Sequence, residues 1–203
     1  MNGKFFDLKK EKQDRMLNAA LKIFALQGYR HASTDDIVKE AGISKGLLFH
    51  YFESKLGLYS FVYDYSVRFV MLEMKACVSP VTTELFEVMR QMEMGKMHAM
   101  RAYPYIQLFL NRAMQEDVSE ALLATEEKRE LWIRACENWY QQIDMRRLPV
   151  AVDGPRLYKM LELSIKGLMT ERLADHSFQP EMLYEEICGY LNMMKRIVYQ
   201  PMQ

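Results

Sequence analysis

Residues 31–57 of the chain, HASTDDIVKEAGISKGLLFHYFESKLG, hold two short helical patterns that are separated by one glycine. Ser33 and Thr34 are residue types that cap the amino end of a helix, and Gly42 can end that helix in the left-handed conformation. Ser44 can cap a second helix directly afterwards. Two short helices joined by a tight turn form a helix-turn-helix unit, whose second helix enters the major groove of DNA. The segment therefore predicts a DNA-reading head.

Helical periodicity continues on both sides of this segment. Residues 9–27 predict an amphipathic helix that closes at Gly28, and residues 54–76 predict a helix roughly 33 Å long. Proline and Asp-Gly signals divide the rest into further helices at about 82–101, 104–115, 118–145 (which could break near Thr125), 155–174 and 181–199. We therefore expect an all-α fold of about nine helices. Its helix-turn-helix domain would cover residues 1–57, and a larger helical bundle would cover residues 58–203.

The composition is that of a globular protein. Of the 203 residues, 50% are hydrophobic and 27% are charged, a balance that disordered chains do not have. Nine Gly and six Pro are too few for the many turns of a β-sandwich or barrel. The sequence has no uninterrupted apolar run of about 18 residues and no apolar leader, so we expect a cytoplasmic protein without membrane contact.

The formal net charge of zero hides an uneven distribution. Residues 1–60 contain ten Lys and Arg against seven Asp and Glu, whereas the remaining residues carry the compensating excess of acids. Because duplex DNA is a dense polyanion, a basic head on a neutral chain favours a nucleic-acid contact. Three charges alone are weak support for that contact.

The sequence shows no arrangement of catalytic or metal-binding residues. Cys77, Cys136 and Cys188 are widely spaced, and the four histidines are isolated. No nucleophile–base pair, GxSxG motif or phosphate loop is present. We expect no enzymatic activity, no metal and no cofactor. A helical carrier or enzyme for apolar small molecules, with no DNA role, stays open as an alternative.

The order of residues between positions 30 and 59 resembles the TetR (tetracycline-repressor-like) family of bacterial transcription regulators. The matching residues are Ala32-Ser33-Thr34, Asp36-Ile37, Ala41-Gly42-Ile43-Ser44-Lys45-Gly46, Leu48-Phe49-His50-Tyr51-Phe52, Ser54-Lys55 and Leu58-Tyr59. The resemblance covers about a quarter of the chain by motif. The C-terminal part of such proteins varies widely, so the resemblance does not identify a ligand.

The resemblance implies two groups of DNA-contacting residues. One group would bind phosphate through hydroxyl, ammonium and helix amino-terminal groups. It comprises Thr34, Lys45, Tyr51 and Lys55. The other group would meet base edges or thymine methyl groups from the exposed front of the second helix. It comprises Ser44, Leu47 and His50.

Two further positions of the second helix matter for DNA. Gly46 would let the helix backbone approach the duplex, since a helix-interior glycine otherwise costs about 1 kcal/mol. Phe49 stands where the family usually has tyrosine, so a phosphate-bonding hydroxyl is absent and only apolar contact remains. Leu48 and Phe52 are expected in the core, and Tyr51 is balanced between packing and phosphate contact.

Methionine is abundant in the C-terminal part, with 17 in the whole chain. Met89, Met92 and Met100 share a helical stripe that predicts plain core first and a wall for an apolar ligand second, because methionine adapts to irregular shapes. Met94 and Met97 are expected at the surface. Aromatic residues that could complete a ligand pocket are Tyr103, Phe109, Trp132 and Trp139.

The last two predicted helices carry apolar residues at helical steps, together with Ser164 and Gly167, which are small enough for close helix approach. They predict a homodimer through a four-helix bundle, or packing on their own chain. The resulting hypothesis is a ligand-responsive repressor that binds a palindromic double-stranded DNA operator as a dimer. A small apolar or amphipathic effector would release it. A protein-docking role for the C-terminal part is a third alternative.

Overall fold

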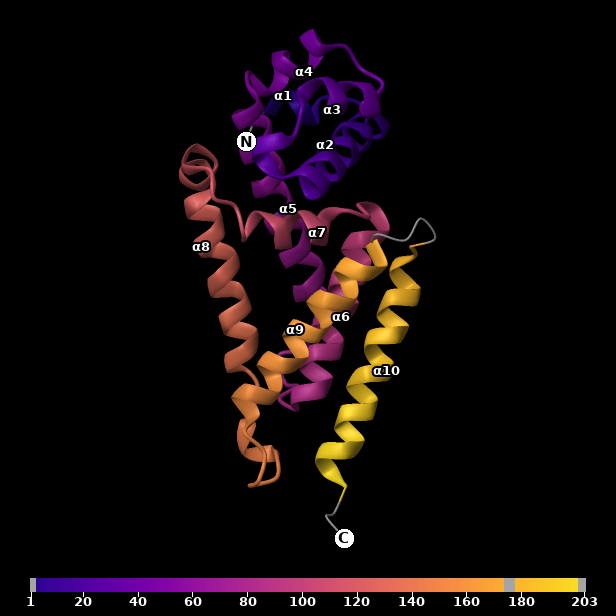
Figure 1. Ribbon diagram of the computed structural model, residues 1–203, viewed down its shortest axis with the longest axis vertical. Coiled ribbons are helices and arrows are strands. Elements are labelled where there is room, and N and C mark those ends of the chain that lie inside the picture. Colours follow the sequence, from indigo (N-terminus) through magenta and orange to yellow (C-terminus); the bar gives the residue numbers. More distant parts are fainter. Residues whose placement is uncertain (1–2, 174–177, 201–203) are drawn as a thin grey trace. The chain divides into compact units, whose positions relative to one another are not determined.

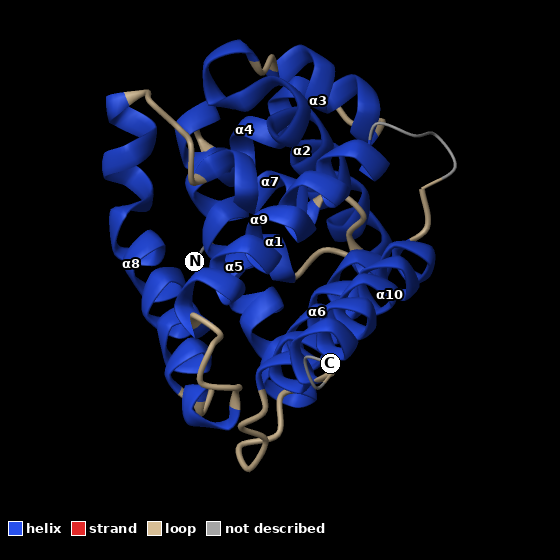
Figure 2. Ribbon diagram, turned by 60° about the horizontal axis from the view of Figure 1, so that its bottom comes forward, coloured by secondary structure: helices blue, strands red, loops and turns tan. Residues whose placement is uncertain are grey.

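The computed structural model of the chain describes residues 3–173 and 178–200, and every regular element in those ranges is helical (Figure 2). This confirms the predicted all-α class. The described part contains ten α-helices and one short 3₁₀ helix, and the chain divides into two compact units. Each unit is discontinuous in sequence, whereas the expected division was a cut between residues 57 and 58.

Unit 1 comprises Met1–Phe69 and Ala102–Trp132. Its complete helices are α1 (Gly3–Phe6), α2 (Lys10–His31), α3 (Thr34–Ala41), α4 (Lys45–Phe52) and α7 (Ile106–Ala113). The first parts of α5 (Lys55–Cys77) and α8 (Ser119–Gln141) also belong to it.

Unit 2 comprises Val70–Arg101 and Ile133–Gln203. It holds the ends of α5 and α8, together with α6 (Leu85–Ala102), the 3₁₀ helix η1 (Met145–Arg147), α9 (Gly154–Leu173) and α10 (Pro180–Tyr199). The helices α9 and α10 pack against each other (Figure 1).

The core of unit 1 forms where α2 packs against α3 and α7. Three buried rings meet at this core: the ring centroid of Phe24 lies 5.0 Å from that of Tyr59 and 6.2 Å from that of Phe109. Aromatic rings that pack edge to face at such distances stabilise a core beyond their buried area. The helix that follows the helix-turn-helix and the distant α7 therefore belong to the same core as α2.

The core of unit 2 is organised around α6, which is buried on most of its surface. The side chains of Met89, Met92, Met97 and Met100 are all buried. The expectation of a surface position for Met97 was therefore wrong, because α6 is covered on more than one side. Gly95 is also buried, and it lies against the backbone of α5.

Several helix boundaries differ from the sequence prediction. The short helix α1 was not predicted. The predicted close of the preceding helix at Gly28 is confirmed, because Gly28 has a non-helical backbone with φ 71° that kinks the span Lys10–His31 of α2. The helix α8 does not break near Thr125, whose buried hydroxyl donates to the Ala121 carbonyl at 2.8 Å. It ends at Gln141, four residues earlier than expected.

Candidate DNA-binding site

The first helix of the site, α3, is held at both ends by local hydrogen bonds. The Ser33 hydroxyl accepts from the Asp35 amide at 3.1 Å, which identifies Ser33 as the cap. Gly42 ends the helix with φ 62° and ψ 43°, and the Ile43 amide donates to the Val38 carbonyl at 3.1 Å. This left-handed turn redirects the chain, and glycine adopts it without steric cost.

The second helix, α4, begins at Lys45, with three residues between it and the end of α3, and is capped by Ser44, whose hydroxyl accepts from the Leu47 amide at 3.2 Å. Its inner face is formed by Leu48 and Phe52, which are 1% and 5% exposed, as the sequence predicted. Phe52 packs in a ring cluster with Phe5 and Phe61 at centroid distances of 5.3 and 5.0 Å. Sequence reasoning missed Phe5, because α1 is too short for a periodic signal.

The outer face of α4 carries the residues that were expected to read DNA. Ser44, Lys45, Gly46 and His50 are exposed to solvent. The residues that are only half-buried are Thr34, Leu47, Phe49, Tyr51 and Lys55. The nine predicted positions thus lie in one helix-turn-helix and its flanks, with no member fully buried.

Lys45 is oriented by an acidic residue of the preceding helix. Its ammonium lies 2.8 Å from the Asp35 carboxylate, and the two side chains are 52% and 70% exposed. An ion pair this exposed contributes only about 0–1 kcal/mol. A phosphate can therefore displace Asp35 from Lys45.

Lys55 makes internal contacts. Its ammonium donates to the Ala32 carbonyl at 3.1 Å and to the Arg30 carbonyl at 3.4 Å, and it lies 4.5 Å from the centroid of the Tyr29 ring. A cation near the carboxyl end of a helix interacts favourably with the exposed carbonyl groups. The phosphate contact assigned to Lys55 stays a prediction, since the same ammonium also closes the end of α2.

The Tyr51 ring is partly packed in the core and partly exposed to solvent. Its centroid is 6.1 Å from that of Phe5 and 5.0 Å from that of His50. The ring therefore contacts both the buried cluster and the exposed front of α4, and the phosphate contact assigned to Tyr51 stays a prediction.

The base of the head is fixed by the first part of α8. The Tyr29 hydroxyl donates to Glu120 at 2.6 Å, and the Tyr29 amide donates to Glu116 at 3.2 Å. Burial and the Glu120 carboxylate raise the pKa of the Tyr29 hydroxyl, so it stays protonated and continues to donate. Ser60 donates to the Ala124 carbonyl at 2.9 Å.

The residues proposed for a ligand pocket are divided between the two units. Tyr103, Phe109 and Trp132 belong to unit 1 and are buried. The Tyr103 hydroxyl donates to Asp14 at 2.7 Å and receives a hydrogen bond from Lys10 at 3.0 Å. The residues in unit 2 are Met89, Met92 and Met100, which are buried, and Trp139, which is half-buried.

The three methionines are therefore core residues, which was the first interpretation of their stripe. A cavity of about 720 Å³ in unit 1 is lined by other residues, from α4, α5 and the start of α8. The assignment of an effector pocket to the methionine stripe stays a prediction.

Taken together, capped helices, a glycine turn and a solvent-exposed second helix define a helix-turn-helix DNA-binding domain. Residues 16–60 match the model of the family described as bacterial regulatory proteins, tetR family. This confirms the resemblance, and the chain carries a TetR-type helix-turn-helix domain. The matched family consists of transcription regulators and is not an enzyme family.

Curated relatives agree over the same segment. The chain is 42% identical over 59 residues to the uncharacterized HTH-type transcriptional regulator YuxN of Bacillus subtilis, which is 27% of this chain and 20% of YuxN. It is 43% identical over 49 residues to the HTH-type transcriptional activator FasR of Mycolicibacterium smegmatis, which is 24% of this chain and 22% of FasR. The match thus spans about a fifth of these relatives.

Solved structures extend the likeness of the fold to most of the chain. The TetR-family regulator PfmR of Thermus thermophilus has a TM-score of 0.63 at 16% identity, covering 93% of this chain and 96% of PfmR. A TetR-family regulator of Chloroflexus aurantiacus has a TM-score of 0.61 at 18% identity, and the alignment covers 97% of this chain and 95% of that regulator. At these identities the comparison concerns the fold alone.

None of the helices in residues 3–173 and 178–200 combines the length and the apolar character that crossing a membrane requires.

Proposed function

We propose that the chain regulates transcription by binding a palindromic double-stranded DNA operator as a homodimer. The observation that carries this proposal is the two-sided character of α4. Leu48 and Phe52 fix the helix to the head, while Lys45, Gly46 and His50 are exposed on its outer face. A major groove admits a helix presented in this way.

Gly46 gives separate support for DNA contact. An added Cβ at this position would have no heavy atom within 4 Å, so the fold does not require glycine there. Glycine inside a helix is also less favourable than alanine by about 1 kcal/mol. The absence of a side chain is instead explained by close approach of an external partner to the helix backbone.

The dimer would form through α9 and α10. These helices border a groove of about 320 Å³. The face that α9 and α10 form carries large apolar side chains that are 47–59% exposed, namely those of Met160, Leu163, Tyr190, Met193 and Ile197. A second copy packed on this face would bury them in a four-helix bundle. Two heads would then bind two half-sites, which compensates for the few contacts of one short helix.

The effector in this proposal is a small apolar or amphipathic molecule, and its binding releases the operator. The helix α5 supports such coupling, because it is continuous from Lys55 in unit 1 to Cys77 in unit 2. A ligand that displaces its second half would also displace its first turn, at the base of the head. Couplings of this kind amount to about 1–3 kcal/mol and are reciprocal.

The DNA-binding step is tested by selecting bound sites from random duplexes with the full chain. We expect a palindromic site, and we expect Lys45→Ala and Gly46→Leu each to abolish retention while thermal unfolding is unchanged. Lys75→Ala, which removes an exposed lysine from unit 2, is the matched control and should bind normally. Retention of DNA by both α4 variants would contradict binding through α4, and a wild-type chain that selects no site would favour the carrier or enzyme alternative.

The dimer and the effector need their own measurements. Light scattering should give the mass of a dimer for the wild type and of a monomer for Met193→Glu. Thermal shift with a panel of apolar compounds, with and without operator, should show that compound and operator oppose each other. Additive stabilisation would contradict release by an effector, and a panel without any hit would favour the protein-docking alternative.

A further inference from the structure

Unit 2 contains a cleft that the DNA-binding proposal does not use. A cavity of about 670 Å³ lies at the start of α6, η1 and the last turns of α10. Its lining residues are Glu84, Arg147, Asn192, Lys195, Arg196 and Tyr199. This volume falls in the range of about 300–1,000 Å³ that is typical of small-molecule sites.

The cleft and the proposed dimer face occupy different sides of α10. Asn192, Lys195, Arg196 and Tyr199 follow the spacing i, i+3, i+4, i+7, which places them on one stripe of the helix. At about 100° per residue, Tyr190 and Ile197 fall roughly 140–160° from Asn192, and Met193 falls about 100° from it. The apolar face is therefore centred on another side of α10 than the polar stripe, and dimerisation through it leaves Asn192, Lys195 and Tyr199 accessible.

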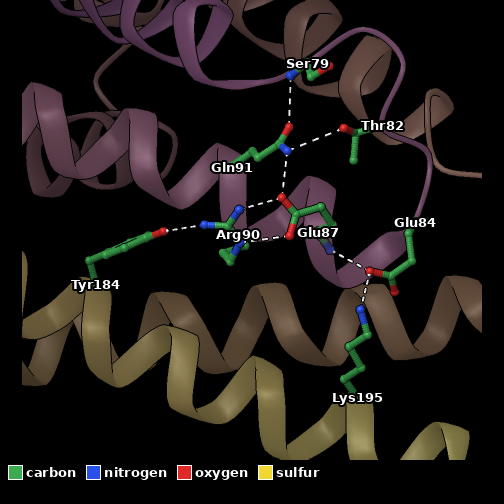
Figure 3. Close-up of polar contacts among 8 residues, drawn as sticks. All are labelled: Ser79, Thr82, Glu84, Glu87, Arg90, Gln91, Tyr184 and Lys195. Atoms are coloured by element: carbon green, nitrogen blue, oxygen red, sulfur yellow. Dashed lines mark hydrogen bonds and ion pairs between the residues drawn. The ribbon is translucent and has the colours of Figure 1, made fainter.

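The carboxylate of the cleft is already satisfied by the protein. One Glu84 oxygen accepts from the Phe86 amide at 3.2 Å. The other oxygen accepts from the Glu87 amide at 3.0 Å and from the Lys195 ammonium at 2.9 Å (Figure 3). Glu84 thus caps α6 and positions Lys195, whose ammonium has two further N–H donors.

The next acid along α6 is also paired. The Glu87 carboxylate receives two hydrogen bonds from the Arg90 guanidinium, at 2.9 and 2.5 Å, and one from Gln91 at 2.7 Å (Figure 3). Arg90 also donates to the Tyr184 hydroxyl at 3.2 Å. The hydrogen bonds from Arg90 and Gln91 lower the pKa of Glu87, and the Arg90 charge within α6 balances the Glu87 charge.

The two arginines of the cleft form no close ion pair among the described residues, although the Arg147 charge contributes to lowering the pKa of Asp144. Arg147 donates to the Thr83 hydroxyl at 3.1 Å, and the Asp144 amide donates to the Thr83 carbonyl at 2.9 Å, which fixes η1 in place. The Asp144 carboxylate is bound by Arg146. Within residues 3–173 and 178–200, the nearby carboxylates of Asp144 and Glu84 form their ion pairs with Arg146 and Lys195, and no ion pair within 4.0 Å involves Arg147 or Arg196.

We propose that this cleft binds a small multivalent oxyanion, either a phosphate ester or a polycarboxylate, between Arg147 and Arg196. A guanidinium offers a planar fork of donors that matches the oxygens of phosphate and carboxylate. Lys195 adds a third cation, Asn192 adds an amide donor, and Tyr199 forms an aromatic wall beside Phe86 at a centroid distance of 6.2 Å. The site does not depend on DNA binding.

Isothermal titration of the full chain tests the site, with sodium pyrophosphate in one arm and citrate in the other at constant ionic strength. We expect saturable binding at one site per chain. Tighter binding of pyrophosphate would assign the site to phosphate esters, and tighter binding of citrate would assign it to polycarboxylates. The absence of saturable binding in both arms would overturn the proposal.

Variants that each remove one positive charge, inside or outside the cleft, distinguish binding in the cleft from general electrostatic attraction. Arg147→Gln and Arg196→Gln should each weaken binding by about tenfold or more, since each removes a charged hydrogen-bonding partner. Both side chains are exposed, so the fold should be retained. Arg156→Gln removes an equal charge from α9 and should change affinity by less than about twofold. A loss with Arg156→Gln as large as with Arg196→Gln would contradict the proposal.

Discussion

Gly95 of α6 lies so close to Met74 of α5 that no side chain fits between them. An added Cβ at Gly95 would be 2.5 Å from the Met74 Cα and 2.8 Å from the Met74 nitrogen. Backbone atoms of a packed helix cannot move away as a flexible side chain can. The crossing of these helices in unit 2 therefore requires glycine at position 95.

Gly95→Ala should destabilise the protein by about 1–3 kcal/mol or more, because it forces the two helix backbones apart. Urea denaturation measures the change. Gly46→Ala is the matched control, since its Cβ would meet nothing within 4 Å, and it should be neutral or slightly stabilising. Equal stability of both variants would exclude the tight crossing.

Glu93 and Lys96 form an ion pair inside unit 2. Their charged atoms are 2.6 Å apart, and the side chains are 5% and 17% exposed. Glu93→Gln leaves the Lys96 charge without its partner and should cost about 3–5 kcal/mol in the free energy of unfolding. The double variant Glu93→Leu with Lys96→Met should recover most of that loss. Strictly additive losses in the double variant would show that the two charges are not coupled.

Alkaline pH should weaken unit 2 through Tyr158 and Lys96. Burial raises the pKa of Tyr158 to about 12, although the nearby Lys96 charge lowers it. For Lys96, burial alone would lower the pKa, but Glu93 outweighs burial and the net shift is upward. Both groups are held in their protonated forms by the fold, so their stabilisation is complete below the unfolded-state values of about 10 and 10.4.

The midpoint of thermal unfolding should therefore fall as pH rises from about 10 to 12. Tyr158→Phe should reduce the slope of this fall, because the variant has no hydroxyl to ionise. An identical slope in both proteins would mean that Tyr158 titrates alike in the folded and unfolded states.

Asp35 should restrain DNA binding, because it holds Lys45 in an exposed ion pair. Asp35→Asn should raise operator affinity by about two- to fivefold and change stability by less than about 1 kcal/mol. Fluorescence anisotropy with labelled operator measures the affinity. Asp36→Asn removes the neighbouring exposed acid without freeing Lys45. An equal gain with that control would reflect general charge and not the release of Lys45.

Phe49 should limit affinity for the operator, because a half-buried ring at this position has no hydroxyl to donate to phosphate. Phe49→Tyr should strengthen binding by about three- to tenfold, as expected for one hydrogen bond to a charged group. The effect is read in the same anisotropy titration, with Phe49→Leu as the apolar control. If Tyr and Leu at this position bind equally, the missing hydroxyl has no influence.

The helix-turn-helix could be predicted from the sequence because its signals are local. Ser33 and Ser44 bond to amides two and three residues away, and Gly42 turns the chain within two residues. Such contacts depend only on neighbouring residues, so the caps, the turn and the buried side of α4 follow from sequence. The short α1 could not be predicted, because its Phe5 is fixed by distant rings.

The sequence by itself determined the helical class, the DNA-reading segment and its exposed residues. Only the tertiary structure decided that Gly95 is required at a helix crossing, and that Met97 is buried. It alone brought Glu84, Arg147 and Arg196 into one cleft, although they come from three separate segments. Contacts between such segments depend on how whole helix faces are buried together, and no short stretch of residues encodes that arrangement.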